Sequence, residues 1–385
     1  MHKLNLRPHI HSLACFSLLW GLLSACMISP SLTPTPSLIL ATPDTTAIPI
    51  TPQPNGQVCW EIPADVSMTD SWADVKAQNS PLVGGGGIAF GFGADDVPMW
   101  TMMGWKTFAM PPDEPTNGNF HIWLPDDGSN TGPIDLRFMV LLDELQLAGV
   151  LNGSLGKYYD VTLEPGMELT LTFHLPPLAP GIHDLNIVGL INAPAEPDPY
   201  GIIKSIHHRT TLLVGPTPLA IAKPYVQFPA DGSVAKRDPL ITALVPGLKT
   251  DLLLAWNWPE TRLPISATES VDFYLYAGYA PVTNVNVPEL LPPQKMPMAV
   301  LLFMDYQQID IAPETLVLYG EVTDDTAYTR IGVTLPSPTT AGRHDILALR
   351  INYPGVPMCV LQGPFDGRIF PYSVDASRVA IEVTP

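Results

Sequence analysis

Two histidines, each followed by an aspartate, are the side chains of this sequence that most resemble catalytic or metal-binding groups. His183 and His344 each come after a turn and a glycine, Gly181 or Gly342, and each opens an apolar run. A histidine beside a carboxylate could act as a general base or supply ligands to a metal ion. Consecutive strand residues point to opposite faces, so the two side chains of one pair cannot converge on one ion. We therefore expect Gly181, His183, Gly342 and His344 to form structural corners.

The remaining groups that could carry chemistry do not form a recognisable catalytic pattern. The glycine run at 84–87 precedes a predicted strand and lacks the spacing of a dinucleotide-binding loop. The acidic pairs lie in polar turns without the regular spacing of a calcium loop, and the His-His pair at 207–208 is expected in a solvated loop. No Gly-x-Ser-x-Gly motif occurs. The sequence thus favours a protein that is not an enzyme and needs no metal or cofactor.

The first residues have the features of an export signal. Lys3 and Arg7 precede a short apolar run at 13–23, and this run leads to Leu-Ser-Ala-Cys ending at Cys26. That ending resembles the lipobox of bacterial lipoproteins, in which the chain is cut before the cysteine and the cysteine is acylated. Two or more acyl chains give stable membrane anchoring. The resemblance implies a lipid on Cys26 and an extracytoplasmic protein anchored to a bacterial membrane; the alternative is an ordinary signal peptide with an incidental cysteine.

Composition divides the chain into a leader, a stalk and two folded domains. The predicted segments are a signal peptide at 1–25, a lipidated cysteine and Pro/Thr/Ser-rich stalk at 26–56, and domains at 57–217 and 218–385. The stalk is too polar to fold and its prolines hold it extended. The formal net charge is -18 and no basic run exists, so a nucleic-acid partner is not expected; the membrane is expected as a partner through the lipid anchor alone.

Each domain is predicted to be all-β, because the hydrophobic period is two. Residues 169–173 and 271–276 alternate between apolar and polar positions, and turn residues separate such runs. Landmarks of the first domain return in the same order in the second: Val140–Leu142 is matched with Val300–Leu302, and the two His-Asp pairs with each other. The sequence therefore predicts a duplication, with two tandem immunoglobulin-like β-sandwich domains.

The run from Val140 to Pro194 resembles the bacterial cell-adhesion-related (CARDB-type) domain. The residues that carry the resemblance are a strand at 139–147, a second at 159–163, the Pro165-Gly166 turn and the Pro-Gly-Ile-His run ending at His183. The resemblance implies a fibronectin-III or immunoglobulin-like sandwich that acts as a spacer, adhesion or binding module. The Gly-x-His element is also similar to the tyrosine corner of such sandwiches, with the ring tip bonded to backbone just upstream.

Cys59 and Cys359 would be the thiols of the folded part. In an oxidising compartment they could form a disulfide, and the alternative is two buried thiols.

A segment rich in tryptophan and methionine is the strongest candidate for a binding face. Residues 98–123 contain Trp100, Trp105 and Trp123, which could contact a glycan or a protein; the alternative is that they fill the core or the seam between the two domains. We expect a non-catalytic binding or structural module, with carbohydrate binding through 98–123 as the alternative function.

Overall fold

The computed structural model of the chain describes the strands and most of the turns between them. The described ranges are 89–93, 99–100, 107–110, 112–124, 132–148, 156–191, 205–215, 223–227, 242–246, 262–266, 271–278, 283–284, 296–322, 328–335, 338, 340–361, 368–369 and 374–384. The leader, the stalk, Cys59 and the glycine run lie outside these residues. The expectations for those segments, and the domain boundaries, stay predictions.

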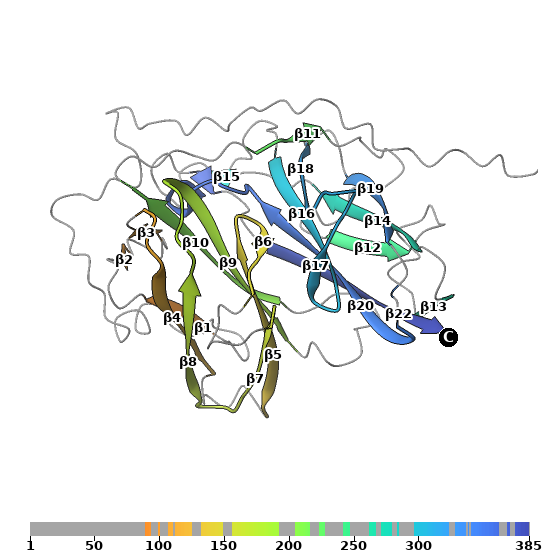
Figure 1. The fold of residues 1–385 in the computed structure, drawn as a ribbon, viewed down its shortest axis with the longest axis horizontal. Helices are drawn as coiled ribbons and strands as arrows, with labels where there is room; N and C mark the ends of the chain where they lie inside the picture. Colours follow the sequence, from red (N-terminus) through yellow and green to blue (C-terminus); the bar gives the residue numbers. More distant parts are fainter. Residues whose placement is uncertain are drawn as a thin grey trace, which may run out of the picture. The chain divides into compact units, whose positions relative to one another are not determined.

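The first β-sandwich consists of a large and a small sheet (Figure 1). In order across the large sheet, its strands are β2 (Met99–Trp100), β3 (Thr107–Met110), β10 (Ser205–Val214), β9 (Gly181–Ile191), β5 (Ile134–Leu142) and β6 (Leu145–Gln146), with β7 (Tyr159–Leu163) also paired to β5. The small sheet has the order β1 (Ala89–Gly93), β4 (Thr116–Trp123) and β8 (Glu168–Leu175). Neighbouring strands are antiparallel except for β3 and β10, which are parallel.

The core of the first sandwich lies between these two sheets. Ile122 of β4 and Leu171 of β8 pack with Leu136, Phe138 and Ile187 of the large sheet in one buried cluster. The period of two explains this arrangement, since alternate side chains of each strand face the other sheet.

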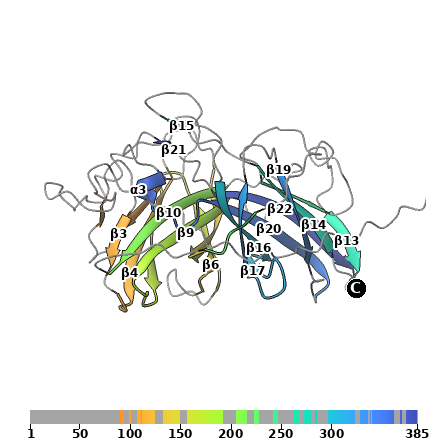
Figure 2. The ribbon, with the colours of Figure 1, turned by 90° about the horizontal axis from the view of Figure 1, so that it is seen from above.

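The second β-sandwich repeats the plan. Its large sheet has the order β11 (Val226–Gln227), β18 (Val317–Val322), β16 (Met296–Met304), β20 (Gly342–Asn352), β22 (Val374–Thr384) and β13 (Arg262–Ser266), with β17 (Gln307–Ile309) paired to β16. The small sheet is β12 (Thr242–Pro246), β14 (Val271–Gly278) and β19 (Tyr328–Leu335). A separate pair, β15 (Thr283–Asn284) and β21 (Arg368–Ile369), and a short helix α3 (Met358–Leu361) complete the described elements. Figure 2 shows β16, β20 and β22 in a second view.

The predicted fold class, all-β with immunoglobulin-like sandwiches, is confirmed. The second sandwich has its own core between its sheets, in which Ile331 and Val333 of β19 pack with Val300, Ile346 and Ile381.

None of the helices in the part of the chain that the structure describes is long and apolar enough to cross a membrane.

The predicted Pro-Gly turn has the conformation that the sequence calls for. Gly166 has a φ of 80°, the value that the third residue of a type II turn requires. This turn connects β7 of the large sheet with β8 of the small one.

Two predictions about the strands are wrong in detail. The run 139–147 is not one strand, because the chain reverses at Asp143 and Glu144 between β5 and β6. The His-His pair at 207–208 lies inside β10 rather than in a solvated loop, and His208 is buried.

The predicted match between Val140–Leu142 and Val300–Leu302 is two residues out of register. Leu142 pairs with Leu185, and Met304 pairs with Ile346 in the same way. Val140–Leu142 therefore corresponds to residues 302–304. A shift of two residues keeps the same side chains on the same face, so an apolar run alone cannot reveal the error.

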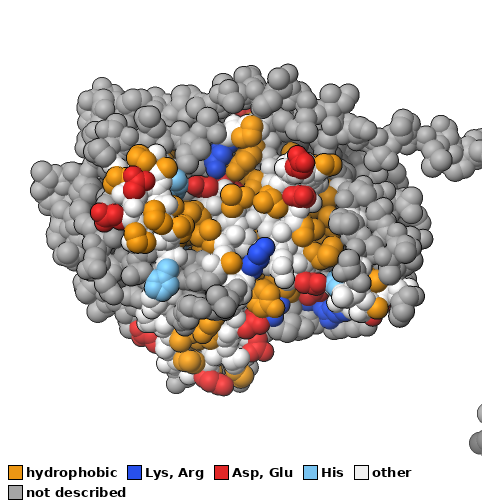
Figure 3. Space-filling model, viewed as in Figure 1, with side chains coloured by type: hydrophobic (Ala, Val, Ile, Leu, Met, Phe, Trp, Pro, Cys, Tyr) orange, Lys and Arg blue, Asp and Glu red, His pale blue; other side chains and the backbone are white. Residues whose placement is uncertain are grey.

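The described part of the surface in Figure 3 has acidic and apolar side chains interspersed, and no broad basic area is visible on it.

Candidate functional site

The first histidine closes a corner of its sandwich with both of its ring nitrogens. His183 Nδ1 lies 2.6 Å from a carboxylate oxygen of Asp143, and His183 Nε2 lies 2.8 Å from the carbonyl oxygen of Ala179. The other oxygen of Asp143 accepts a hydrogen bond from the amide of Asp184 at 3.0 Å. Asp143 is the first residue of the β5–β6 turn, so this contact fixes the turn to the start of β9.

The second histidine makes the same contacts in the second sandwich. His344 Nδ1 lies 2.6 Å from Asp305 Oδ2, and Nε2 lies 2.9 Å from the carbonyl oxygen of Thr340. The amide of Asp345 donates to Asp305 Oδ1 at 3.0 Å. We refer to these two arrangements, His183 with Asp143 and His344 with Asp305, as the His-Asp clamps.

The arrangement of the His-Asp clamps favours the protonated form of both rings. A carbonyl oxygen and a carboxylate are both acceptors, so a ring that donates from both nitrogens satisfies both contacts; Nε2 of His344 also lies 3.3 Å from the hydroxyl oxygen of Thr340. Burial by itself would lower the pKa of His183, but the hydrogen bond to Asp143, the bond to the Ala179 carbonyl and the carboxylate charge outweigh it and raise the pKa. The same balance raises the pKa of His344.

The turn held by each His-Asp clamp has an unusual backbone. Asp143 and Glu144 have φ values of 49° and 68°, and Asp305 and Tyr306 have 49° and 63°. Positive φ at both central residues is the pattern of a type I′ hairpin turn, which normally favours Asn-Gly. Here each aspartate tolerates it through its bond to a backbone amide, and the second position carries a large side chain that contacts the other sandwich.

The carboxylate of Asp184 belongs to a buried ion pair within the first sandwich. Arg209 of β10 holds it with Nε at 2.8 Å and Nη2 at 2.6 Å. The same guanidinium donates to the carbonyl oxygens of Asn352 and Tyr353, both at 2.6 Å. Arg209 therefore joins β9 of the first sandwich to the end of β20 in the second.

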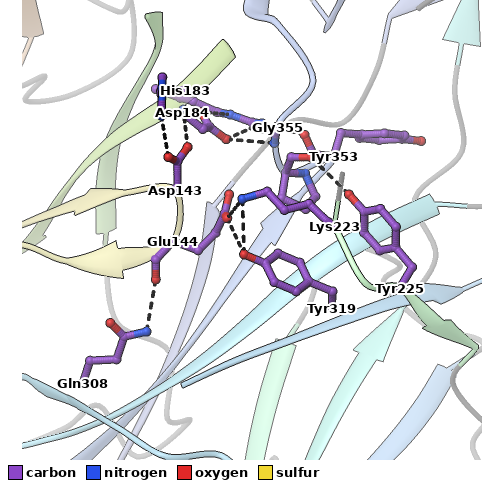
Figure 4. Close-up of polar contacts among 12 residues, drawn as sticks. Asp143, Glu144, His183, Asp184, Lys223, Tyr225, Gln308, Tyr319, Tyr353 and Gly355 are labelled. Carbon is purple, nitrogen blue, oxygen red and sulfur yellow. Dashed lines mark hydrogen bonds and ion pairs between the residues drawn. The ribbon is translucent and has the colours of Figure 1, made fainter. Parts of the chain in front are cut away.

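Glu144 lies at the centre of a second buried group. Its Oε2 accepts from Lys223 Nζ at 2.7 Å and from the hydroxyl of Tyr319 at 2.7 Å. Figure 4 shows these side chains converging from the turn, the segment before β11 and β18. Burial raises the pKa of Glu144 more than Lys223 lowers it. Burial and the nearby Glu144 charge also raise the pKa of Tyr319, so this hydroxyl stays a donor.

Both ring nitrogens of each clamp histidine contact protein atoms. Each imidazole is fully hydrogen-bonded within the protein, and a general base needs a nitrogen that can reach the substrate. In the described residues no three His, Cys, Asp or Glu side chains are grouped closely enough to hold a metal ion. What the arrangement does is fix turns and connect one sandwich to the other.

The corner residues predicted from the sequence lie within the first three positions of β9 and β20. Gly181 begins β9 and Gly342 begins β20. Gly342 has a φ of 121°, which strains any other residue, whereas Gly181 has no positive φ. His183 and His344 are both buried.

The structure does not bring the predicted binding tryptophans together in one sheet. Trp100 lies on β2 of the large sheet, Trp123 ends β4 of the small sheet, and Trp105 lies outside the described residues. Glycan binding through this segment stays a prediction.

The structure does not test the predicted roles of the cysteines. Cys359 is in α3, while Cys26 and Cys59 lie outside the described residues. The lipid attachment and the disulfide therefore stay predictions.

Several residues of the site were missed by the sequence analysis. They are Asp143, Asp305, Glu144, Arg209, Lys223 and Tyr319. A correct register of the duplication would have revealed the two aspartates, since each directly follows an equivalent apolar strand and precedes a His-Asp pair by 40 or 39 residues. Nothing in the sequence marks Glu144 or Lys223 as buried.

Comparison with known proteins found no matching family model and no matching curated protein. Among solved structures, the CARDB domain of a Pyrococcus furiosus protein, determined in complex with di-metal ions, is 14% identical with a TM-score of 0.20, over 34% of this chain and 89% of that one. A solution structure of that domain is 15% identical with a TM-score of 0.19, over 34% of this chain and 96% of that one. Dimeric latent PorU from Porphyromonas gingivalis is 13% identical with a TM-score of 0.19, over 81% of this chain and 21% of that one. At these identities the similarities imply no shared ligand or activity.

Proposed function

We propose that this protein is an extracytoplasmic lipoprotein, anchored through acylated Cys26, and that its two β-sandwiches act as a non-catalytic binding or structural module. The stalk at 26–56 would lift the folded part away from the membrane. Adhesion and spacing are the roles that such a construction suits, because both need a rigid body held at a distance from the lipid surface.

The observation that carries the non-catalytic part of the proposal is the duplication of the His-Asp clamp. The two clamps use the same atoms, with Nδ1–Oδ2 distances of 2.6 Å in both and ring-to-carbonyl distances of 2.8 and 2.9 Å. A second identical clamp, whose ring is likewise bonded to a backbone carbonyl, would add nothing to catalysis. A fold-stabilising corner is needed once in every sandwich, which explains why both copies keep it.

The anchoring part of the proposal depends on the leader. Leu-Ser-Ala precedes Cys26 at the end of a short apolar run, and small residues before such a cysteine suit signal cleavage and acylation. A single acyl chain binds a membrane only marginally, whereas two or three give stable attachment.

Metabolic labelling with an alkyne analogue of palmitate tests the anchor. The wild-type chain should be labelled and recovered with membranes, and Cys26→Ala should be unlabelled and released. Cys15→Ala is the matched control, because this cysteine would leave with the leader and its loss should change neither result. A Cys26→Ala protein that is still labelled or still membrane-bound would contradict the proposal.

A further inference from the structure

The two large sheets share a third apolar core, separate from the core inside each sandwich. Its members come from β5 and β9 of the first sandwich and, in the second, from β16, β20 and the turn between β16 and β17. They are Met139, Leu141, Val188, Leu190, Ala299, Leu301, Phe303, Tyr306, Leu347, Leu349 and Ile351. By the strand register, Met139 corresponds to Leu301, and Leu141 corresponds to Phe303. The two sandwiches thus contact each other through equivalent faces.

The hairpin turns at the edge of this shared face exchange hydrogen bonds reciprocally. The amide of Gln146 donates to Gln308 Oε1 at 2.8 Å, and the amide of Gln308 donates to Gln146 Oε1 at 2.8 Å. Gln146 Nε2 donates to the carbonyl of Tyr306 at 2.8 Å, and Gln308 Nε2 donates to that of Glu144 at 3.0 Å. When residue i contacts j and the equivalent j contacts i, the interface has the geometry of a twofold homodimer.

Several equivalent positions carry side chains of different charge or polarity and break this symmetry. Arg137 of β5 corresponds to Ala299, and its guanidinium lies 4.3 Å from the ring centre of Tyr306. Glu144 corresponds to Tyr306, the second residue of the other turn.

A third unequal position is Asn186, which corresponds to Leu347. Asn186 is fully buried, and neither polar atom of its side chain has a hydrogen-bond partner. A buried unsatisfied amide is costly, so its presence in an otherwise apolar face calls for an explanation.

Pairing between two copies of the first sandwich would be unfavourable at these positions. Asp160 of β7 pairs with Arg137, and Tyr319 of β18 pairs with Ala299, the counterpart of Arg137. In a pair of first sandwiches, Asp160 would therefore stand where Tyr319 stands now. Glu144 would then face the Asp160 carboxylate instead of the Tyr319 hydroxyl and would lose Lys223, and two unsatisfied Asn186 side chains would face the same core. Asp160 keeps its own ion pair with Arg137, so the selection depends on the loss of Lys223 and on the two buried amides.

We infer that the shared face is a docking surface with the geometry of a homodimer interface, and that its partner is another sandwich of the same kind. Glu144 and Asn186 make this surface pair with the second repeat of the same chain rather than with another copy of the first repeat. Polar groups buried in an apolar interface can specify the partner at some cost in stability. This inference concerns only the contact between the repeats and does not depend on the proposed function.

Cleavage of the full chain between the repeats tests the docking surface. Residues 216–222 are replaced by a protease recognition sequence of the same length, and the folded protein is cut and analysed by native mass spectrometry and light scattering. The expected product is a 1:1 complex of the two fragments. Separation into monomers would overturn the docking surface, and rearrangement into dimers of each fragment would overturn the selection.

The double variant Glu144→Tyr with Asn186→Leu tests the selecting residues in the same cleavable chain. It makes two positions of the first face equal to those of the second, so the ratio of first-fragment homodimer to 1:1 complex should rise at least about tenfold, equivalent to 1.4 kcal/mol. An unchanged ratio would overturn the selection. Glu114→Tyr, at an exposed residue before β4, is the control and should leave the ratio unchanged.

Asn186→Leu alone keeps the number and branching of the side-chain heavy atoms and leaves the Glu144 ion pair intact. It should shift the ratio in the same direction by a smaller factor, and circular dichroism of the uncut protein checks its fold. A shift toward the 1:1 complex would contradict the role of Asn186.

Discussion

Replacing His183 with phenylalanine removes the charge from the first His-Asp clamp while keeping a ring of similar size. Asp143 would lose its partner at 2.6 Å, and the carbonyl of Ala179 would lose its donor at 2.8 Å. Asp143 would keep its bond from the amide of Asp184, and its side chain, 21% exposed, would keep some contact with water.

The expected loss in the free energy of unfolding follows from the strength of these bonds. A hydrogen bond to a charged group contributes about 1.5–3 kcal/mol and a neutral one about 1 kcal/mol. Because Asp143 keeps one partner and some water, the lower end applies, and we expect the free energy of unfolding to fall by about 2–3 kcal/mol at pH 6.

Urea unfolding followed by circular dichroism measures this loss at pH 6 and pH 9. A neutral ring can donate from only one of its two nitrogens, so the difference between wild type and His183→Phe should shrink at pH 9. His174→Phe, at an exposed residue of β8, is the control and should change stability by about 0.5 kcal/mol or less. A loss no larger than the control's, or a loss of equal size at both pH values, would refute the reasoning.

Three further predictions use the same unfolding assay. Arg209→Met should lower stability by about 3–5 kcal/mol, because it leaves the Asp184 carboxylate buried without its counter-charge; a change under about 1 kcal/mol would contradict the role of this ion pair. Gly166→Ala should cost about 1 kcal/mol because of the positive φ, whereas Gly132→Ala, at a residue with open space around it, should be neutral or slightly stabilising. The pKa of both clamp histidines is raised on folding, so the folded state holds more protons above about pH 6.5, the ordinary histidine pKa. Wild-type stability should therefore decrease from pH 6 to pH 9, and an increase over that range would contradict the protonated state.

Sequence reasoning was sufficient for the fold class because the β pattern is local. Alternation along 169–173 and the Pro165-Gly166 turn require only neighbouring residues, and β8 and its turn follow from them. The corner histidines could also be singled out, since a glycine and a histidine recur before equivalent apolar runs.

The partners of those histidines could not be predicted for a physical reason. Asp143 is 40 residues from His183, and only the pairing of β5 with β9 brings them together. Glu144 resembles an ordinary exposed turn residue in the sequence. It is buried because the other sandwich covers it, and that contact depends on three-dimensional packing that no local pattern encodes.

The buried charges and the third apolar core should hold the two sandwiches together as one folding unit. Native-state hydrogen exchange, followed by mass spectrometry at increasing urea, measures this coupling most directly by comparing β9 with β20. The slowest amides of both strands should reach the same opening free energy and respond equally to urea, because exposing either strand breaks the shared core. Opening energies that stay apart by more than about 1 kcal/mol as urea increases would show two independent units and contradict the claim.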